Sequence, residues 1–348
     1  MTAPPAARVQ ALGSAVPEHV YKQAEIVDDF FARRAGWDPA YAELFQASGV
    51  ERRAAVVDVH EYYATSRTTA DRMETFAPAA RRLGAAAARR ALDRAEPGAA
   101  ATVDELIAVS CTGYAGPGLD VHLAADLQLR PDLARLALGH MGCYAALPAL
   151  RTAAALAAGG RRVLVACVEL CSLHLQPIAS RQDAVTSALF ADGAAAALVG
   201  PDGPGPRIAA ARTATLPASE GRMGWAVGDE GFRMTLSPRV PALVERGVGA
   251  LVHGLLAGHG LAVDEVAHWV VHPGGPEILE RVQRRLGLAD AQLARSWEVL
   301  ADGGNRSSAT ILFILDALVA SGDLEPGQWV VMLAFGTGLT MEALLLRA

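Results

Sequence analysis

The chain carries two copies of one pattern, one in each half, and this repeat limits the folds open to it. Val-Asp-Glu-Leu begins at Val103 and Val-Asp-Glu-Val begins at Val263, and each precedes an apolar segment with the pattern of a buried strand. Further on, a Gly-Cys pair ending at Cys143 and a Gly-Asn pair ending at Asn305 each open an apolar stretch with a helical pattern. Two copies packed about a pseudo-twofold axis would bring Cys143 and Asn305 to a common pocket.

The composition indicates a globular protein with a large core. The chain has 348 residues, of which 52% are hydrophobic and 20% charged, so it is not a disordered sequence. The formal net charge is −6 and no run of Lys or Arg is long enough to form a nucleic-acid surface, so no nucleic-acid partner is expected. No membrane span is expected either, because the longest apolar stretch, 309–320, contains Asp316.

The cysteines and the N-terminus predict a cytoplasmic protein without a metal site. Four cysteines occur in the chain, and none has the spacing of metal ligands. The N-terminal segment lacks a basic stretch followed by an apolar one, so no signal peptide is expected. Reduced thiols in the cytoplasm follow from these two observations.

A segment rich in Pro and Gly, 201–206, predicts a boundary between two domains, 1–203 and 204–348. Each half alternates buried-looking strands with helices, which favours an α/β fold in five layers, with mixed sheets covered by helices on both faces. Strands are expected at 9–15, 106–111, 136–138, 163–168 and 194–199, and then at 208–215, 267–271, 329–335 and 339–346. Helices are expected at 23–34 and 79–94, beside the two that open at Cys143 and Asn305.

Cys143 is the candidate nucleophile. A thiol at a helix N-terminus lies near unpaired N–H groups and the positive end of the helix dipole, and both favour the thiolate. A free cysteine has a pKa of ~8.5, which such surroundings lower to roughly 3.5–7.5. The alternative is a small buried side chain without a chemical role, as most cysteines are. The helix-start position and the repeat favour the nucleophile.

His272 and Asn305 are the candidate partners of this thiol. His272 ends an apolar strand before a Pro-Gly-Gly turn, at the sheet edge where function concentrates in α/β proteins. A neutral imidazole there can donate to a carbonyl oxygen or raise the thiolate fraction of Cys143, and a purely structural histidine is the alternative. The amide of Asn305 can donate to a developing oxyanion without titrating, while its oxygen caps the following helix.

A Cys/His/Asn set of this kind fits acyl transfer to sulfur followed by carbon–carbon bond formation. A thioester on Cys143 would hold the growing chain. His272 and Asn305 would stabilise the enolate that remains when a malonyl group loses carbon dioxide. No proton has to be taken from carbon, so no strong carboxylate base is required.

These residues lie in strings that resemble those of the type III polyketide synthases, or chalcone synthase superfamily, which have the thiolase fold. The resemblance covers nearly the whole chain. The strings that carry it are Gly142-Cys143, Leu189-Phe190-Ala191-Asp192-Gly193-Ala194, His272-Pro273-Gly274-Gly275-Pro276, Gly304-Asn305-Arg306-Ser307-Ser308 and Phe335-Gly336-Thr337-Gly338-Leu339-Thr340. The His-Pro-Gly-Gly-Pro string and the closing glycine loop are specific to this group.

The resemblance implies a duplicated αβαβα thiolase-like fold with two mixed five-stranded sheets, and a homodimer. It implies malonyl-CoA as the extender, a starter carried by CoA or by an acyl carrier protein, no cofactor beyond these thioesters, and a pyrone or phenolic product. It also implies that Cys143 accepts the acyl group and that His272 and Asn305 serve decarboxylation and oxyanion stabilisation. Phe190 would be a gatekeeper between the CoA tunnel and the cavity, and residues 336–338 would shape the cavity wall by close backbone approach.

Further positions resemble bacterial members that make tetrahydroxynaphthalene or alkylpyrones. The segments around Cys111 and Cys171 correspond to parts of the cavity lining in those members. His174 stands where Cys or Thr is expected, so it would influence starter choice or cyclisation. Met234 stands where plant members carry a second gatekeeper phenylalanine, which would open the mouth to longer or bulkier starters.

Two departures from the family pattern bear on the site. Thr337 replaces the proline that is usual in the closing loop. Uncharged or acidic residues stand where plant-type members carry basic residues for the CoA phosphates. Arg52 and Arg53 are nearby candidates for that role, and a solvated surface pair is the alternative. A carrier-protein donor or a different set of arginines would also explain the missing basic residues.

Three other functions fit parts of the pattern. A ketoacyl synthase III-like enzyme has the same three residue types, extends once and takes chains from an acyl carrier protein. A papain-like cysteine hydrolase has Cys, His and Asn in the same order, but the chain lacks that family's local cysteine signature. A catalytically inert structural partner of the same fold has no need for all three residues together.

Overall fold

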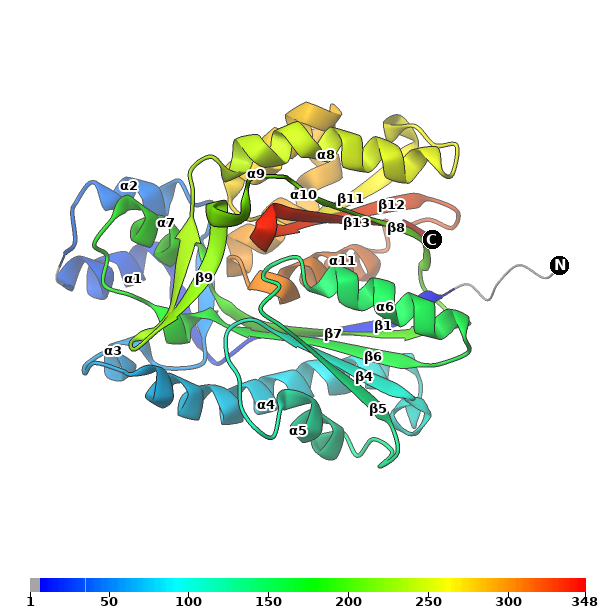
Figure 1. The fold of residues 1–348 in the computed structure, drawn as a ribbon, viewed down its shortest axis with the longest axis horizontal. Coiled ribbons are helices and arrows are strands. Elements are labelled where there is room, and N and C mark those ends of the chain that lie inside the picture. The colour runs from blue at the N-terminus through cyan, green and yellow to red at the C-terminus, as the bar shows by residue number, and fades with distance from the viewer. Residues whose placement is uncertain (1–6, 35) are drawn as a thin grey trace.

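The computed structural model describes residues 7–34 and 36–348 and arranges them in five alternating layers of helix and sheet (Figure 1). Helix α4 covers the outer face of the sheet of the first half, and α8 covers that of the second half. Helices α6 (Ala146–Ala158) and α11 (Thr310–Ser321) lie between the sheets. The layered α/β fold expected from the sequence is confirmed.

The other helices are α1 (Gln23–Asp29), α2 (Tyr41–Gln46), α3 (Val59–Tyr62), α4 (Thr69–Ala95), α5 (Leu119–Asp126), α7 (Arg181–Leu189), α8 (Val240–Ala257), α9 (Pro276–Leu286) and α10 (Asp290–Gly303). The strands are β1 (Arg8–Ala15), β2 (His19–Lys22), β3 (Arg52–Ala55), β4 (Glu105–Ser110), β5 (Ala134–Gly139), β6 (Val163–Leu170), β7 (Asp192–Gly200), β8 (Arg207–Thr215), β9 (Met223–Gly228), β10 (Gly231–Leu236), β11 (Val266–Val271), β12 (Trp329–Gly336) and β13 (Thr340–Arg347).

The order of strands repeats between the two halves. It is β1-β7-β6-β4-β5 in the first half and β8-β13-β12-β11 in the second. The pairs β1–β7 and β8–β13 are antiparallel, as are β7–β6 and β13–β12, whereas β6–β4 and β12–β11 are parallel. The same four-strand unit therefore occurs twice, which explains the repeated strings of the sequence.

The halves differ at one sheet edge, and here the expected strand count is corrected. Among the described residues the second half contributes four strands to the large sheet, because nothing in it corresponds to β5. The two sets of strands meet at a single residue pair, Arg8 opposite Arg207. The nine strands therefore form one continuous hydrogen-bonded sheet, and not the two separate five-stranded sheets that the resemblance implies.

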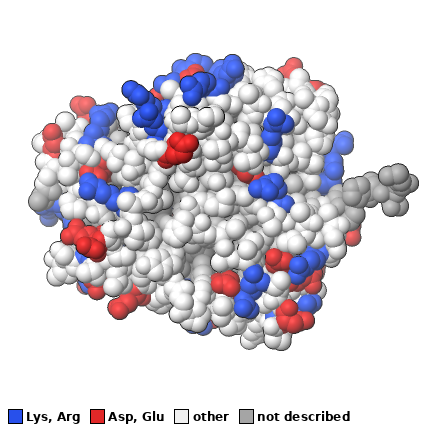
Figure 2. Space-filling model, in the orientation of Figure 1, with Lys and Arg blue, Asp and Glu red and all other residues white. Residues whose placement is uncertain are grey.

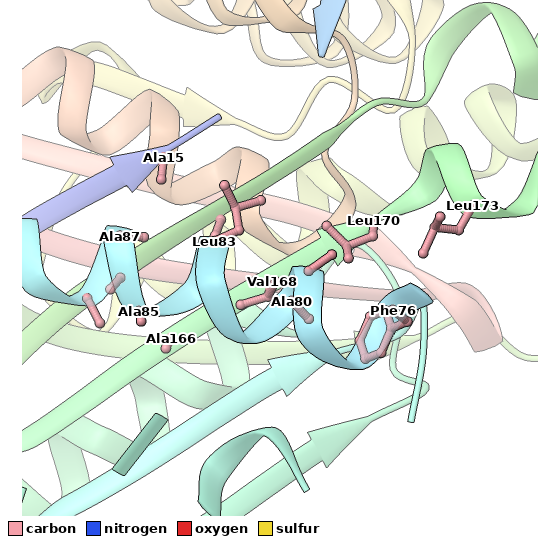
Figure 3. Packing of buried hydrophobic residues seen from close by; sticks show 14 of the residues in the cluster. Ala15, Phe76, Ala80, Leu83, Ala85, Ala87, Ala166, Val168, Leu170 and Leu173 are labelled. Carbon is pink, nitrogen blue, oxygen red and sulfur yellow. The ribbon is translucent and has the colours of Figure 1, made fainter. Parts of the chain in front are cut away.

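Helix α4 packs closely on the sheet of the first half (Figure 3). Its face toward the sheet carries small residues such as Ala80, beside Ala166 and Val168 of β6. Gly84 interrupts the helical pattern of the sequence, and a Cβ there would come within 2.8 Å of the Val168 side chain. The glycine therefore permits the close approach of helix and strand.

Helix α4 begins well before residue 79, where the sequence pattern predicts it. Thr68 and Asp71 form a capping box at its start, so two of the unpaired N–H groups of the first turn have partners. Pro78 consequently lies inside the helix and not in its first turn.

Helix α8 is the one described helix that is long and apolar enough to cross a membrane by length and composition. The sequence pattern does not single it out, because Glu245 and Arg246 interrupt its apolar run. In the fold, α8 buries Val244 and Val248 in the cluster that contains Leu345 of β13. It is therefore the outer layer of the core in the second half.

Charged side chains are spread unevenly over the face seen in Figure 2. Arginines gather over α8 and α9 at the top of the view, where Glu245 pairs with Arg281 and Arg284. The middle of this face is largely free of charged side chains.

Candidate active site

Cys143 lies in a turn between β5 and α6 and is almost entirely buried. Helix α6 begins at Ala146, so Cys143 precedes the helix instead of opening it. Gly142 has a φ of +82°, a conformation that favours glycine. Only 6% of Cys143 is exposed, and it belongs to the apolar cluster that contains Cys171 and Phe190.

Asn305 lies beside Cys143. Its backbone N–H donates to the carbonyl of Leu189 at 2.8 Å, and its carbonyl accepts from the N–H of Ala191 at 2.9 Å. Its Oδ1 accepts from the backbone N–H of Ser307 at 2.8 Å. The side chains of Asn305 and Ser307 lie near the Cys143 sulfur, where they lower the pKa of the thiol. The amide oxygen of Asn305 is thus used locally, which leaves its NH2 group for the thiol.

His272 lies at the end of β11 and is 1% exposed. Its backbone N–H donates to the carbonyl of Leu333 at 2.8 Å. Neither ring nitrogen has a hydrogen-bond partner among the described residues. Burial lowers the pKa of His272 to about 3, so the ring is a neutral imidazole near neutral pH. It offers one donor and one acceptor to a bound molecule.

The surroundings of Cys143 act against the thiolate that the sequence pattern favours. Burial raises the pKa of the Cys143 thiol to about 12 because the charged form loses its hydration. The side chains of Ser307 and Asn305 oppose this effect, and the nearby carboxyl group of Glu169 adds to it.

Glu169 is a site residue that the sequence pattern does not single out. It is fully buried in β6, where it accepts hydrogen bonds from the Cys111 N–H (3.1 Å) and from the hydroxyl groups of Thr112 (2.9 Å) and Ser308. Burial raises its pKa. The Cys111 sulfur lies 3.1 Å from both Glu169 Oε1 and Ser307 Oγ. A carboxylate inside an otherwise apolar strand is the signal that identifies this residue in the sequence.

Four of the predicted cavity residues line one small cavity of about 40 Å³. They are Cys171, His174, Phe190 and Met234. The hairpin of β9 and β10, which the sequence pattern does not predict, forms part of the wall with Trp225 opposite Met234. Cys111 and the loop 336–338, also predicted to line the cavity, are not among the lining residues.

Both ring nitrogens of His174 are used by the protein. Nε2 donates to the carbonyl of Thr112 at 2.6 Å, and Nδ1 accepts from the backbone N–H of Phe232 at 3.1 Å. The ring stacks on Phe232 with 4.3 Å between centroids. Burial lowers the pKa of His174 to about 4. His174 therefore ties the β9–β10 hairpin to the loop after β4.

The closing loop, 336–338, lies against the turn that carries Cys143. A Cβ on Gly336 would come within 2.3 Å of the Tyr144 ring. Gly338 has a φ of +115°, which only glycine adopts readily. The close backbone approach expected for this loop is thus an approach to Tyr144.

Arg53 is not available to bind CoA, which corrects one of the two arginine predictions. Its side chain is buried and donates to Gln23 Oε1 and to the carbonyls of Ser187 and Phe190. Burial lowers its pKa to about 9. Arg52 faces solvent and pairs with Asp302, so of these two arginines only Arg52 can reach a phosphate in solution.

Comparison with known protein families accounts for almost the whole chain. Residues 2–203 match chalcone and stilbene synthases, N-terminal domain, and residues 207–348 match the C-terminal domain of the same family. The chain is 34% identical over 353 residues to 1,3,6,8-tetrahydroxynaphthalene synthase of Streptomyces peucetius subsp. caesius, covering 97% of this chain and 92% of the relative. It is 30% identical over 364 residues to the alpha-pyrone synthesis polyketide synthase-like Pks18 of Mycobacterium tuberculosis, covering 99% and 92%.

Solved structures of the same family share the fold. PKS-I from the brown alga Ectocarpus siliculosus matches with a TM-score of 0.92 and 28% identity, covering 98% of both chains. The C-terminal type III polyketide synthase domain of Steely1 from Dictyostelium matches with a TM-score of 0.91 and 28% identity, covering 98% of this chain and 99% of that one. The thiolase-like fold is therefore confirmed. The chain belongs to the chalcone and stilbene synthase family and is a type III polyketide synthase, an acyltransferase that forms carbon–carbon bonds.

Proposed function

We propose that the polyketide grows as a thioester on Cys143. The Cys143 sulfur attacks the carbonyl of the starter thioester, the bond to CoA breaks, and the thiol proton passes to the departing CoA sulfur. Attack by a neutral thiol is eased if its proton leaves as the carbon–sulfur bond forms. The observation that carries the proposal is that the Asn305 side chain lies near the buried Cys143 sulfur and lowers the pKa of its thiol.

We assign the condensation step to His272 and Asn305. Malonyl-CoA loses carbon dioxide, and the enolate oxygen that remains accepts hydrogen bonds from the Asn305 NH2 group and a His272 N–H. The enolate carbon attacks the Cys143 thioester, a carbon–carbon bond forms, and the carbon–sulfur bond breaks, which leaves the extended chain on CoA and a thiolate at Cys143. Before the next extension this thiolate attacks the thioester of the extended chain, and CoA leaves as a thiolate that takes a proton from water. The unpartnered ring nitrogens of His272 support this role, because a buried donor without a protein partner is available to a ligand.

We further propose roles around this centre. Phe190 and Met234 gate the cavity, Cys171 and His174 shape its wall, the loop 336–338 supports the turn that carries Cys143, and Arg52 contributes to binding of CoA phosphates. Repeated extension and ring closure give a pyrone or phenolic product, in line with the names of the relatives. No metal is proposed, and in residues 7–34 and 36–348 no group of three or more His, Cys, Asp and Glu could hold one.

The working form is proposed to be a cytoplasmic homodimer, and each subunit is proposed to comprise two domains, 1–203 and 204–348. Strand β5 supports the dimer, because it pairs only with β4 among the described residues and its Leu136 and Leu138 are partly exposed. An open sheet edge with apolar side chains is a ready surface for a second copy.

Product profiling tests the proposal. Purified enzyme is mixed with malonyl-CoA and a panel of acyl-CoA starters, and the products are identified by mass spectrometry. Several extensions per starter followed by ring closure are expected. A single extension with an open β-keto product would instead indicate the ketoacyl synthase III-like alternative, for which the comparisons provide no support.

Variants assign the roles. Cys143→Ala is expected to abolish all products, and Asn305→Ala is expected to reduce decarboxylation of malonyl-CoA by about 10²- to 10³-fold, as loss of one oxyanion donor does. Products that survive Cys143→Ala would contradict the covalent mechanism. The exposed Val319, which lies on α11, provides the control substitution Val319→Ala.

A further inference from the structure

The closing loop and the turn that carries Cys143 meet at Thr337. The Thr337 hydroxyl donates to the carbonyl oxygen of Met141 at 3.0 Å. The Thr337 methyl carbon would lie 3.3 Å from a Cβ placed on Gly142. Both branches of one side chain therefore reach the two residues that lead into Cys143.

The same loop also supports the turn on the other side of Cys143. Gly336 has no side chain, and its backbone lies so close to Tyr144 that a Cβ would come within 2.3 Å of the ring. The turn itself is short and irregular, with Gly142 at φ +82°, and its backbone hydrogen bonds run from the Ala145 N–H to the Gly142 carbonyl (3.0 Å) and from the Leu147 N–H to the Tyr144 carbonyl (2.9 Å). Its geometry thus depends on contacts from outside.

We propose that Thr337 is a positioning residue for Cys143. Its hydroxyl holds the Met141 carbonyl, which sets the path of the backbone through Gly142 and the direction in which the sulfur faces the acyl carbonyl. The proline usual at this place in the family pattern has no group that can donate this hydrogen bond. The proposal rests on the proposed function, because the direction of the sulfur matters only if Cys143 accepts the acyl chain.

Two substitutions separate the hydroxyl from the volume of the side chain. Thr337→Val keeps the branched shape and removes the donor, whereas Thr337→Ser keeps the donor. Thr337→Val is expected to lower kcat roughly three- to tenfold at unchanged KM for malonyl-CoA, the range that one neutral hydrogen bond covers. Thr337→Ser is expected to stay within about twofold of the wild type, because it still makes the bond.

Alkylation of the thiols by iodoacetamide without substrate provides a second readout. The Val variant is expected to react faster at Cys143, because the released turn opens locally more often. The other three cysteines, Cys111, Cys167 and Cys171, are also buried and free, so peptide mass spectrometry should show them unchanged. General unfolding would expose all four together.

Thr215→Val is the matched control, because it removes a hydroxyl that bonds to Thr340 at 3.1 Å near the same loop without reaching the Cys143 turn. It should change the result of neither assay.

Wild-type behaviour of Thr337→Val in both assays, or equal impairment by Thr337→Ser, would overturn the proposal. If Thr337→Val does not fold, Thr337→Ala serves with the same expectations. If condensation requires Cys143 but substitutions of Thr337 change the result of neither assay, the positioning role alone is refuted. If the wild type makes no polyketide, the proposed function is refuted.

Discussion

Burial controls the charge of each side chain at this site. Cys143, His272 and Glu169 are all enclosed, and loss of hydration favours the neutral form of each. It raises the pKa of Cys143 and Glu169 and lowers that of His272. A neutral imidazole at His272 suits a reaction in which charge develops on the enolate and on the departing sulfur.

Alkylation of Cys143 should depend on pH as expected for a thiol with a pKa of about 12. The rate with iodoacetamide is expected to rise about tenfold per pH unit between pH 6 and pH 9, because the thiolate fraction rises by that factor. Peptide mass spectrometry measures the rate at Cys143 separately from the other cysteines. A plateau in the rate near pH 7 would instead show a thiolate paired with an imidazolium.

Asp192 makes stability depend on pH. It is fully buried, accepts from the backbone N–H groups of Ser172 (2.7 Å) and Val56 (2.8 Å), and has its pKa raised by burial to about 6. The unfolded chain has a pKa of ~3.9 at this residue, so the folded state binds the proton more tightly. The stability associated with this proton is therefore complete below about pH 4 and is lost as the pH rises through about 6.

Asp192→Asn should remove this dependence. The free energy of unfolding of the wild type minus that of the variant is expected to fall by ~3 kcal/mol between pH 4 and pH 7. Urea denaturation at a series of pH values measures both proteins. Parallel curves would show that Asp192 does not titrate in this range.

Adjacent residues of one strand serve different purposes in this protein. Arg52 and Arg53 follow each other in β3, and successive side chains of a strand point to opposite faces. Arg52 consequently reaches solvent and Asp302, whereas Arg53 passes into the core and holds the carbonyl of Phe190 at the end of α7. The strand thereby links a surface position to the cavity wall.

Arg53→Met is expected to destabilise the protein by ~3 kcal/mol, because buried carbonyls lose a charged donor. Arg52→Met is the matched control and should change stability by less than ~0.5 kcal/mol, as exposed ion pairs do. It should instead raise KM for CoA substrates. Denaturant unfolding and steady-state kinetics measure the two effects. The opposite pattern would restore Arg53 as a CoA ligand and remove Arg52 from that role.

The hairpin of β9 and β10 should govern which starters are accepted. Met234 faces the cavity from β10, and only about 40 Å³ is free there. Met234→Phe is expected to shift the preference toward shorter acyl-CoA starters, and Met234→Ala toward longer ones. The measurement is kcat/KM over a series of chain lengths. An unchanged profile in both variants would mean that another element sets the limit.

At the scale of the whole molecule, the open edge at β5 predicts association. Sedimentation equilibrium is expected to give a mass near twice the 36.3 kDa of one chain. The mass of a single chain at every concentration tested would refute the homodimer.

Local patterns predict the strands of the large sheet and four of the helices, α1, α4, α6 and α11, but not the other described helices. Apolar runs located the strands of both halves within a few residues, and repeated strings revealed the duplication. The hairpin of β9 and β10 was not predicted, because residues 223–236 mix glycine, charged and apolar residues without a clear period. The sequence pattern places the start of α4 too late, because the first turns of this helix carry polar residues whose helical state depends on the cap at Thr68.

The order of amino acids is enough to show the repeated αβ unit and to point to Cys143, His272 and Asn305, because periodicity and repeated strings are properties of neighbouring residues. The raised pKa of Cys143, the inward path of Arg53 and the closure of the cavity by a hairpin became evident only in the folded chain. Loss of hydration and side-chain contacts depend on groups that lie far apart in the sequence, and no local pattern records which of them meet.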